Sequence, residues 1–381
     1  MKAHSFFVSN ATETLQSIQK ARQNGLQATV AVVFSSPAID YKAICSTLLQ
    51  ENIEVFGCTT AGEISNSEVQ EESAAIMLMD MPRAHYRLLG REFSAGAGNL
   101  KKVAAELGSE ISSNFENSFV LLNVSGLGCD GEEAVHGLRQ TAPTVQVIGG
   151  LAGDDFQMQS TYIFSNNLIT PSGITALVLD KKRFQTVDMA TSGWNAVGVE
   201  KTITKASGNV VYEIDNEPAI DVFGKYFNLS DNLSSQEIVT KIGVKYPLHL
   251  VRPDGSTVLR APLLGNAEDK SLVFAGGLPQ GAKVRFSVAP DLEIVHQTIE
   301  HFSVLKPLMQ EADALLMYSC KARHLTLGPM IDFEVAGAQE IWGGAPLIGF
   351  FSYGEFGTQK DKGLDFHNET CCLVAIREIK D

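Results

Sequence analysis

A cysteine followed by two cations stands at the end of a predicted strand. Cys320, Lys321 and Arg323 follow the predicted strand 314–319. A thiol beside positive charge can have a lowered pKa and act as a thiolate nucleophile. Such a nucleophile also needs a base, for which His367 is a candidate. No sequence pattern brings Cys320 and His367 together, so a Cys/His-dependent enzyme is an alternative and not the main interpretation.

Two glutamates occupy equivalent places in two copies of one motif. The pattern G-x-x-[TS]-x-G-E-[IF] occurs at 57–64 and again at 349–356, and it aligns Glu63 with Glu355. A carboxylate directly after such a turn can accept hydrogen bonds from backbone amides, or it can hold the amine of a ligand. The sequence leaves both readings open.

A third glycine-rich stretch, 126–131, matches G-x-G-x-x-G between a predicted strand and a predicted helix. This is the context of a dinucleotide-binding turn, and Asp154 follows at roughly the distance of a ribose-binding acid. The next strand, however, ends in Gly149 and Gly150 and not in an acid. A plain strand-to-helix turn is therefore the favoured interpretation.

Short apolar runs alternating with helical patterns supply the elements that position these residues. The runs 28–34, 119–124, 145–148, 174–179, 314–318 and 371–376 predict buried strands, and 41–51, 132–140 and 333–340 predict helices. A looser copy of the repeated motif at 149–154 brings the number of related units to three. The pattern predicts an α/β fold, in two related domains (1–214 and 215–381) of mixed β-sheets flanked by helices, built from repeated strand–helix–strand units.

The overall charge disfavours two classes of partner. The formal net charge is −14, and the densest basic stretch has only three residues, Lys181 to Arg183. An acidic surface repels nucleic acid and anionic membranes. No run reaches the roughly 18–20 apolar residues of a membrane-spanning helix. Six scattered cysteines without a framework favour a cytoplasmic protein.

Several segments together resemble the FIST family of prokaryotic sensory proteins. Segments similar to the FIST N and FIST C domains follow one another in order at 56–64, 149–154, 192–198, 211–219, 319–323, 349–357 and 366–370. The resemblance extends from about residue 29 to residue 375.

This resemblance implies a ligand-binding sensor in signal transduction, and not an enzyme. Because both FIST domains fill the chain, its output is expected to act in trans on a partner such as a histidine kinase. The nearest comparison is a stand-alone group within the family that binds haem and senses nitric oxide. That comparison predicts non-covalent haem b, with His367 as the axial ligand of the iron. A FIST sensor for an amino-acid-like ligand without haem is the alternative.

The ligand is expected in a pocket formed by three loops of the C-terminal domain. These loops supply Cys320 and Arg323; Ser352, Tyr353 and Glu355; and His367 and Asn368. All three follow or precede predicted strands, where α/β sheets tend to place ligands. Arg323 would bind a carboxylate, while Glu355 and Asn368 would orient polar groups.

Overall fold

The apolar runs of the sequence form strands that are buried on both faces. The computed structural model describes residues 1–94, 98–227, 237, 243–252, 255, 257–289, 293–358 and 363–380. Within it, every residue is buried in β2 (Val30–Ser35), β8 (Ser118–Val124) and β22 (Ala314–Cys320). A strand with aliphatic side chains on both faces needs a packing layer on each side. The sequence therefore places these strands in the middle of a layered α/β fold.

One structural unit occurs three times along the chain, and each copy builds one mixed sheet. The first copy contains β1 (Lys2–Val8), α1 (Ala11–Gln23), β2, α2 (Tyr41–Gln50), β3 (Glu54–Thr59) and β6 (Ala74–Asp80). Its strands lie in the order β1-β6-β2-β3, with β2 and β3 parallel. Asn10 and Asp40 accept hydrogen bonds from amides in the first turns of α1 and α2, which fixes where these helices begin.

The second and third copies repeat this order as β7-β12-β8-β9 and β13-β26-β22-β23. The second contains η1 (Arg83–His85), β7 (Tyr86–Glu92), α3 (Asn99–Asn114), β8, α4 (Gly131–Thr141), β9 (Gln146–Leu151) and β12 (Gly173–Asp180). The third contains β13 (Phe184–Thr191), α7 (Glu293–Ser303), β22, α8 (Lys321–Leu327), η3 (Gly328–Met330), α9 (Ile331–Glu340), β23 (Leu347–Ser352) and β26 (Cys371–Glu378).

Each sheet is completed by a hairpin from another copy. The first copy gives β4 (Glu63–Ser65) and β5 (Glu68–Gln70) to the third sheet, where β4 pairs with β23. The second gives β10 (Ile163–Ser165) and β11 (Leu168–Thr170) to the first sheet, where β10 pairs with β3. The third gives β24 (Glu355–Thr358) and β25 (Leu364–His367) to the second sheet, where β24 pairs with β9. The three sheets are thus interlocked in a cycle.

The turns at which the chain crosses between sheets bond to one another in a ring. Three backbone hydrogen bonds form it: Ala61 N to Phe351 O at 3.0 Å, Tyr353 N to Leu151 O at 3.2 Å, and Gly153 N to Thr59 O at 2.9 Å. Each bond joins two different copies of the unit. The repeated motif found in the sequence is the segment that makes this ring.

A glycine stands at the same place in the last parallel strand of each copy. A Cβ on Gly57, Gly149 or Gly349 would lie 1.9, 2.0 or 2.4 Å from a carbonyl oxygen of the neighbouring strand. Real Cβ atoms never approach an oxygen so closely, so these three strand pairs require glycine. This explains the first residue of the motif by backbone packing.

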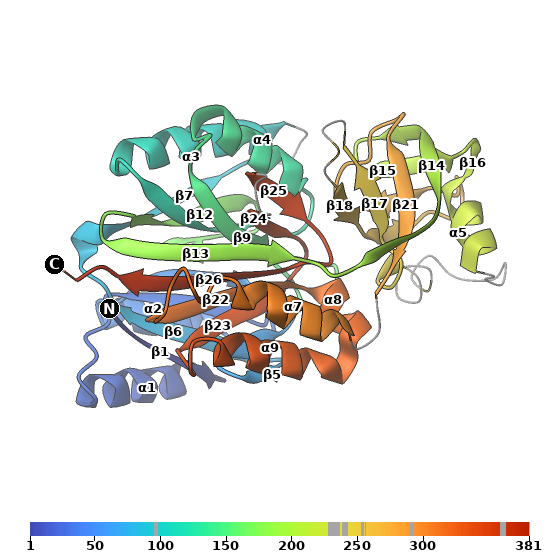
Figure 1. Cartoon of the computed structure of the whole chain (residues 1–381). Coiled ribbons are helices and arrows are strands. Elements are labelled where there is room, and N and C mark those ends of the chain that lie inside the picture. Colours follow the sequence, from blue (N-terminus) through green and yellow to red (C-terminus); the bar gives the residue numbers. More distant parts are fainter. Residues whose placement is uncertain are drawn as a thin grey trace.

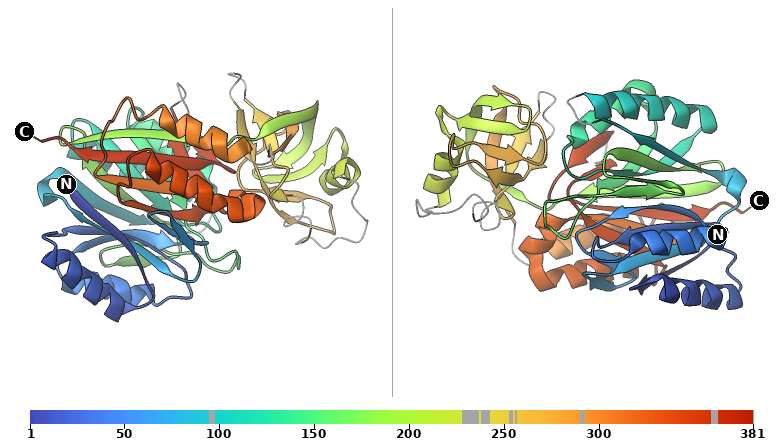
Figure 2. Two further views of the ribbon diagram at one scale, coloured as in Figure 1. Left: turned by 60° about the horizontal axis from the view of Figure 1, so that its bottom comes forward. Right: turned by 180° about the vertical axis from the view of Figure 1, so that it is seen from behind.

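The inner faces of the three sheets meet in one core, and the helices cover their outer faces (Figures 1 and 2). At the centre, the ring centroids of Phe34 and Phe350 lie 4.5 Å apart, and those of Tyr318 and Phe350 lie 5.5 Å apart. Outside, α1 and α2 pack on the first sheet, α3 and α4 on the second, and α7 and α9 on the third. We call this three-sheet structure the body.

A separate β-rich domain is inserted into the third copy, between β13 and α7 (Figure 1). It spans residues 195–288 and contains β14 (Asn195–Ser207), β15 (Val210–Ile214), β16 (Glu217–Pro218), α5 (Ala219–Phe227), β17 (Leu248–Val251), β18 (Thr257–Arg260), β19 (Pro262–Gly265), β20 (Leu272–Phe274) and β21 (Lys283–Val288). It has its own apolar core, which includes Phe223, Phe274 and Phe286. We call it the inserted domain.

The predicted fold class, α/β with mixed sheets flanked by helices and built from repeated strand–helix–strand units, is confirmed. The inserted domain contains strands from both sides of the predicted boundary at 214/215. Strands β14 and β15 precede this boundary, and β17 to β21 follow it. Among the described residues, no helix is both long enough and apolar enough to cross a membrane.

We expect Gly149→Ala to destabilise the protein by at least about 1–3 kcal/mol, the usual cost of forcing extra volume into a packed core. The reason is the 2.0 Å approach of the new Cβ to Leu122 O. Urea denaturation would measure the change. Gly224→Ala in α5 is the control, because a Cβ there meets no atom within 4 Å. Equal stabilities of the two variants would contradict the packing explanation.

Candidate functional site

The structure brings together three of the residues predicted to bind ligand, at the ends of β22 and β23. Ser352 Oγ donates to Glu355 Oε1 at 2.6 Å, and the Cys320 side chain lies close enough to interact with the same carboxyl group. Thr370 N donates to the other oxygen, Glu355 Oε2, at 3.3 Å. All four residues are buried. We call these residues, with the adjacent Glu369, the buried polar cluster.

The same arrangement occurs at the equivalent turn of the first copy. Thr60 Oγ1 donates to Glu63 Oε1, while Ser73 N and Ser73 Oγ donate to Glu63 Oε2 at 3.1 and 2.8 Å. Both repeated glutamates therefore bond backbone amides and hydroxyl groups of their own copy. The sequence left two roles open for these glutamates, capping of backbone amides and binding of a ligand amine. The contacts observed are those of amide capping.

Burial dominates the electrostatics of the buried polar cluster. Burial raises the pKa of Glu355 to about 8. At the equivalent turn of the first copy, it raises the pKa of Glu63 to about 7. It also raises the pKa of the Cys320 thiol well above its usual value, and the neighbouring Glu355 and Glu369 raise it further. A thiol in this environment stays protonated, which is the opposite of an activated nucleophile.

Glu369 is a member of the cluster that the sequence reading missed. Its side chain is fully buried, and neither carboxylate oxygen has a hydrogen-bond partner in the described part of the chain. Burial, together with nearby Glu355, raises its pKa well above the usual range. Its place directly after His367 and Asn368 was the only available signal, because no motif distinguishes a buried carboxyl group from an exposed one.

Arg323 lies near this cluster, but its guanidinium group is engaged elsewhere. Nε donates to Glu334 Oε1 at 2.9 Å, and Nη2 donates to the other oxygen of that carboxylate and to Thr298 Oγ1. Nη1 donates to Ser192 O, and the group lies 5.4 Å from the centroid of the Trp194 ring. A ligand carboxylate would have to displace Glu334 to bind Arg323.

Tyr353 points away from the buried polar cluster and toward the second copy. Its hydroxyl donates to Asp154 Oδ1 and accepts hydrogen bonds from Asp154 N at 3.2 Å and Phe156 N at 2.9 Å. The Asp154 carboxylate also accepts from the amides of Met158, Gln159 and Ser160. Tyr353 and Asp154 therefore shape a loop, and the contacts of the Asp154 carboxylate are those of a structural residue and not of a ribose-binding acid.

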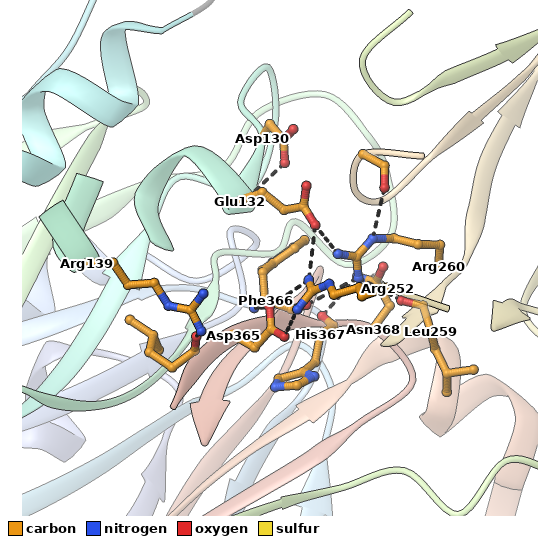
Figure 3. Close-up of polar contacts among 12 residues, drawn as sticks. Asp130, Glu132, Arg139, Arg252, Leu259, Arg260, Asp365, Phe366, His367 and Asn368 are labelled. Atoms are coloured by element: carbon orange, nitrogen blue, oxygen red, sulfur yellow. Dashed lines mark hydrogen bonds and ion pairs between the residues drawn. The ribbon is translucent and has the colours of Figure 1, made fainter. Parts of the chain in front are cut away.

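His367 and Asn368 are both buried and bond to backbone atoms. His367 Nε2 lies 3.3 Å from Gly357 O, and burial lowers the pKa of the ring to about 4. Asn368 Nδ2 donates to His367 O at 3.0 Å, while its Oδ1 has no partner among the described residues. The close-up shows the His367 ring turned away from the polar groups around Asp365 (Figure 3).

The glycines at 126–131 are explained by backbone packing. A Cβ on Gly126 would lie 1.7 Å from Ala152 O, and one on Gly131 would lie 2.4 Å from the Phe366 ring. Gly128 has a φ of +71°, which suits a turn. This agrees with the favoured reading as a strand-to-helix turn.

An open cleft lies between the body and the inserted domain. Its volume is about 710 Å³, and its walls come from α4 and β25 on one side and from β14, β17, β21 and the loop at 277–282 on the other. Its charged or titratable lining residues are Glu132, His136, Arg139, Glu200, Arg252, Lys283 and Asp365. Ligand sites favour such interfaces between domains.

Ion pairs cross this cleft (Figure 3). Arg252 of the inserted domain makes a two-pronged contact with Asp365 on β25, with Nη2 2.9 Å from Oδ1, and it lies 3.5 Å from Glu132 on α4. Arg260, at the end of β18, also pairs with Glu132. These pairs join residues 113 and 128 positions apart in the sequence. No sequence pattern could have predicted them.

Arg139 is the cleft cation that lacks a carboxylate partner within the described residues. Its Nη2 donates to a backbone oxygen, Leu364 O, and the side chain is otherwise exposed toward the cleft. Arg139 and Arg252 therefore present two guanidinium groups to one cleft in a protein whose net charge is −14. This arrangement favours an anionic group of a ligand.

The surroundings of His367 do not fit an axial haem ligand. A haem iron needs an accessible donor next to an apolar space as large as the macrocycle. His367 is 1% exposed and is not among the residues that line the cleft, and the cleft itself is lined by charged side chains. These residues therefore give no support to a bound haem, and haem stays a prediction.

We expect Glu355→Gln to reduce the pH dependence of stability. The pKa of Glu355 is about 8 in the folded protein against 4.5 for an ordinary glutamate, so the folded state holds a proton that the unfolded chain loses. The stabilisation that this carboxyl group contributes is complete below about pH 4.5 and is lost as the pH rises through 8. The free energy of unfolding falls by up to about 1.4 kcal/mol per pH unit over this range.

Urea denaturation at pH 5, 6.5 and 8 would measure this dependence. The wild type should lose stability relative to Glu355→Gln as the pH rises. Glu110→Gln is the matched control, because it alters a partly exposed carboxylate on α3 that pairs with Arg91 on β7. Parallel curves for wild type and Glu355→Gln would show that the buried carboxyl group is ionised throughout.

Comparison with known proteins identifies the family. A family model described as the FIST N domain matches residues 29–217, and one described as the FIST C domain matches residues 219–358. An uncharacterized protein of Mycobacterium bovis is 26% identical over 226 residues, which is 56% of this chain and 56% of that protein. An uncharacterized protein of Methanocaldococcus jannaschii is 22% identical over 366 residues, covering 85% of this chain and 68% of its own length.

The chain thus spans little more than half the length of its mycobacterial relatives, one of which, from Mycobacterium tuberculosis, is 25% identical over 58% of each chain. The two family models together match nearly all of the sequence between residues 29 and 358. FIST domains are sensory domains that serve signalling by small ligands. This chain belongs to the FIST family.

Proposed function

We propose that the protein is a sensor whose amino-acid-like ligand binds in the cleft between the body and the inserted domain. The observation that carries the proposal is that Arg139 and Arg252 line the same cleft. Arg139 has no carboxylate partner among the described residues. Two guanidinium groups can hold a carboxylate by several charge-assisted hydrogen bonds.

The cleft also offers a place for the ligand's amine. Glu200 lines the same cleft, and its only described ion pair is a 3.6 Å contact with Lys283 in which both side chains are about half exposed. Such a loose pair on the surface contributes little and is easily exchanged. In the proposal, the carboxylate of an amino acid binds Arg139 and Arg252, and its ammonium group binds Glu200.

The sensor acts without catalysis in this proposal. The thiol of Cys320 is buried with a raised pKa, and His367 is not among the groups that interact with it. The signal would pass in trans to a partner such as a histidine kinase, since sensory domains transmit a change of conformation and not a product. Haem b with nitric oxide as the signal is kept as an outcome of the test below.

We expect Arg139→Ala to weaken ligand binding about tenfold or more, because it removes one of the two cations that hold the carboxylate. Stability should change little, since Arg139 is exposed and makes one described hydrogen bond, to a backbone oxygen. Isothermal titration of the wild type with each of the twenty protein amino acids, followed by titration of the variant, measures the effect.

Arg91→Ala is the matched control, because Arg91 pairs with Glu110 on the surface of the body and does not line the cleft. Equal affinity in Arg139→Ala and the wild type, or no binding of any amino acid, would reject the proposal. Adding ferrous haem gives the competing outcome. A sharp Soret band that shifts with nitric oxide and disappears in His367→Ala would instead support the haem sensor.

A further inference from the structure

The inserted domain is attached to the body at a hinge and at the cleft. The chain enters the inserted domain through the connection between β13 and β14, which we call the hinge. Arg323 donates to Ser192 O on this connection and to Thr298 Oγ1 on α7, and its guanidinium group lies over the ring of Trp194. The ion pair with Glu334 holds Arg323 in place, so the hinge side is fixed to α8 and α9.

At the cleft, two arginines of the inserted domain differ sharply in environment. The Arg260 side chain is 0% exposed, donates to Phe366 O at 3.2 Å as well as to Glu132, and lies against the Phe366 ring. The Arg252 side chain is 24% exposed, and its partner Asp365 is 13% exposed. Arg260 is therefore an anchor that solvent cannot reach, whereas a solute can reach the pair formed by Arg252 and Asp365.

The contact between Arg252 and Asp365 has the chemistry expected of bound ligand. Both oxygens of a carboxylate face two nitrogens of one guanidinium group, which is the geometry that makes arginine selective for carboxylates. Although burial opposes it, the hydrogen bond from Arg252 lowers the pKa of Asp365 below its usual value. Asp365 is thus a carboxylate held on an arginine that lines the cleft.

We propose that Asp365 is an internal competitor, which occupies on Arg252 the place that a ligand carboxylate takes. The inference rests on the proposed function of the cleft. Binding then exchanges one carboxylate for another on Arg252, and no net charge is buried or exposed at that arginine. The exchange separates Arg252, just after β17, from Asp365 on β25, while Arg260 keeps its hydrogen bond to Phe366 O.

This exchange supplies the differential contact that a sensor needs. A ligand shifts a conformational equilibrium only if it binds one state better than the other. Here the ligand binds the state in which Arg252 has left Asp365, so ligand binding and the opening of this ion pair are one event. Trp194 shares an apolar cluster with Leu259 of β18, the strand that pairs with β17, so its fluorescence can report the change.

The test uses Asp365→Asn, which removes the competing charge and keeps the shape of the side chain. It is made in the full chain carrying Trp342→Phe, so that Trp194 is the remaining tryptophan. Without added ligand, we expect a shifted Trp194 emission and faster amide exchange at residues 280–283 on the cleft wall. With L-glutamate as the probe, we expect about tenfold tighter binding than in the wild type.

Asp215→Asn is the matched control, because Asp215 pairs with Lys201 inside the inserted domain and does not line the cleft. If Asp365→Asn fails to fold, Asp365→Ser gives the same readouts. Unchanged Trp194 emission and amide exchange, or an L-glutamate affinity equal to that of the wild type, would overturn the role of Asp365 as the internal competitor. The cleft would remain the proposed ligand site. Faster exchange without any L-glutamate binding would support Asp365 as the internal competitor and exclude L-glutamate as the ligand.

Discussion

The ring of backbone hydrogen bonds through Ala61, Gly153 and Tyr353 is the constraint on which the rest of the body depends. At each of these residues the chain leaves one sheet and enters another, so its amide would be left without a partner in the interior. An unpaired buried amide costs about as much as a lost hydrogen bond, and the neighbouring copy supplies the missing carbonyl oxygen. No copy can complete its sheet alone, because each sheet needs a hairpin from another copy.

The same crossings explain why so many polar groups are buried at the strand ends. Glu63 and Glu355 stand just after two of the crossings, where they accept hydrogen bonds from nearby hydroxyl and amide groups. With raised pKa values and side chains that are fully buried, these carboxyl groups suit a structural role. The cleft differs because its walls belong to two separately packed parts, so it can exchange its ion pairs without disturbing the core. We therefore propose the cleft as the ligand site and interpret the buried polar groups of the body as structural.

Sequence reasoning placed the predicted strands at β2, β8, β9, β12, β22 and β26, with ends that differ by up to three residues. It also found Cys320, Ser352 and Glu355, which do lie together. It could not tell which way the other side chains point. Tyr353 is next to Ser352 in the chain, yet its hydroxyl reaches Asp154 in another copy because successive side chains of an extended segment face opposite sides. Arg323 is likewise engaged by Glu334 and Ser192, which no spacing indicates. Glu132, Arg139, Arg252 and Asp365 carry no motif.

By itself, the sequence determined the α/β class, the central strands and the repeated glycine motif, because these follow from local rules of periodicity and backbone sterics. Only the tertiary structure decided that the copies exchange hairpins, that a β-rich domain stands between β13 and α7, and where charge meets charge across the cleft. The physical reason is distance along the chain. An apolar run needs burial wherever it packs, whereas Arg252 and Asp365, 113 positions apart, acquire their relationship only when the inserted domain docks on the body.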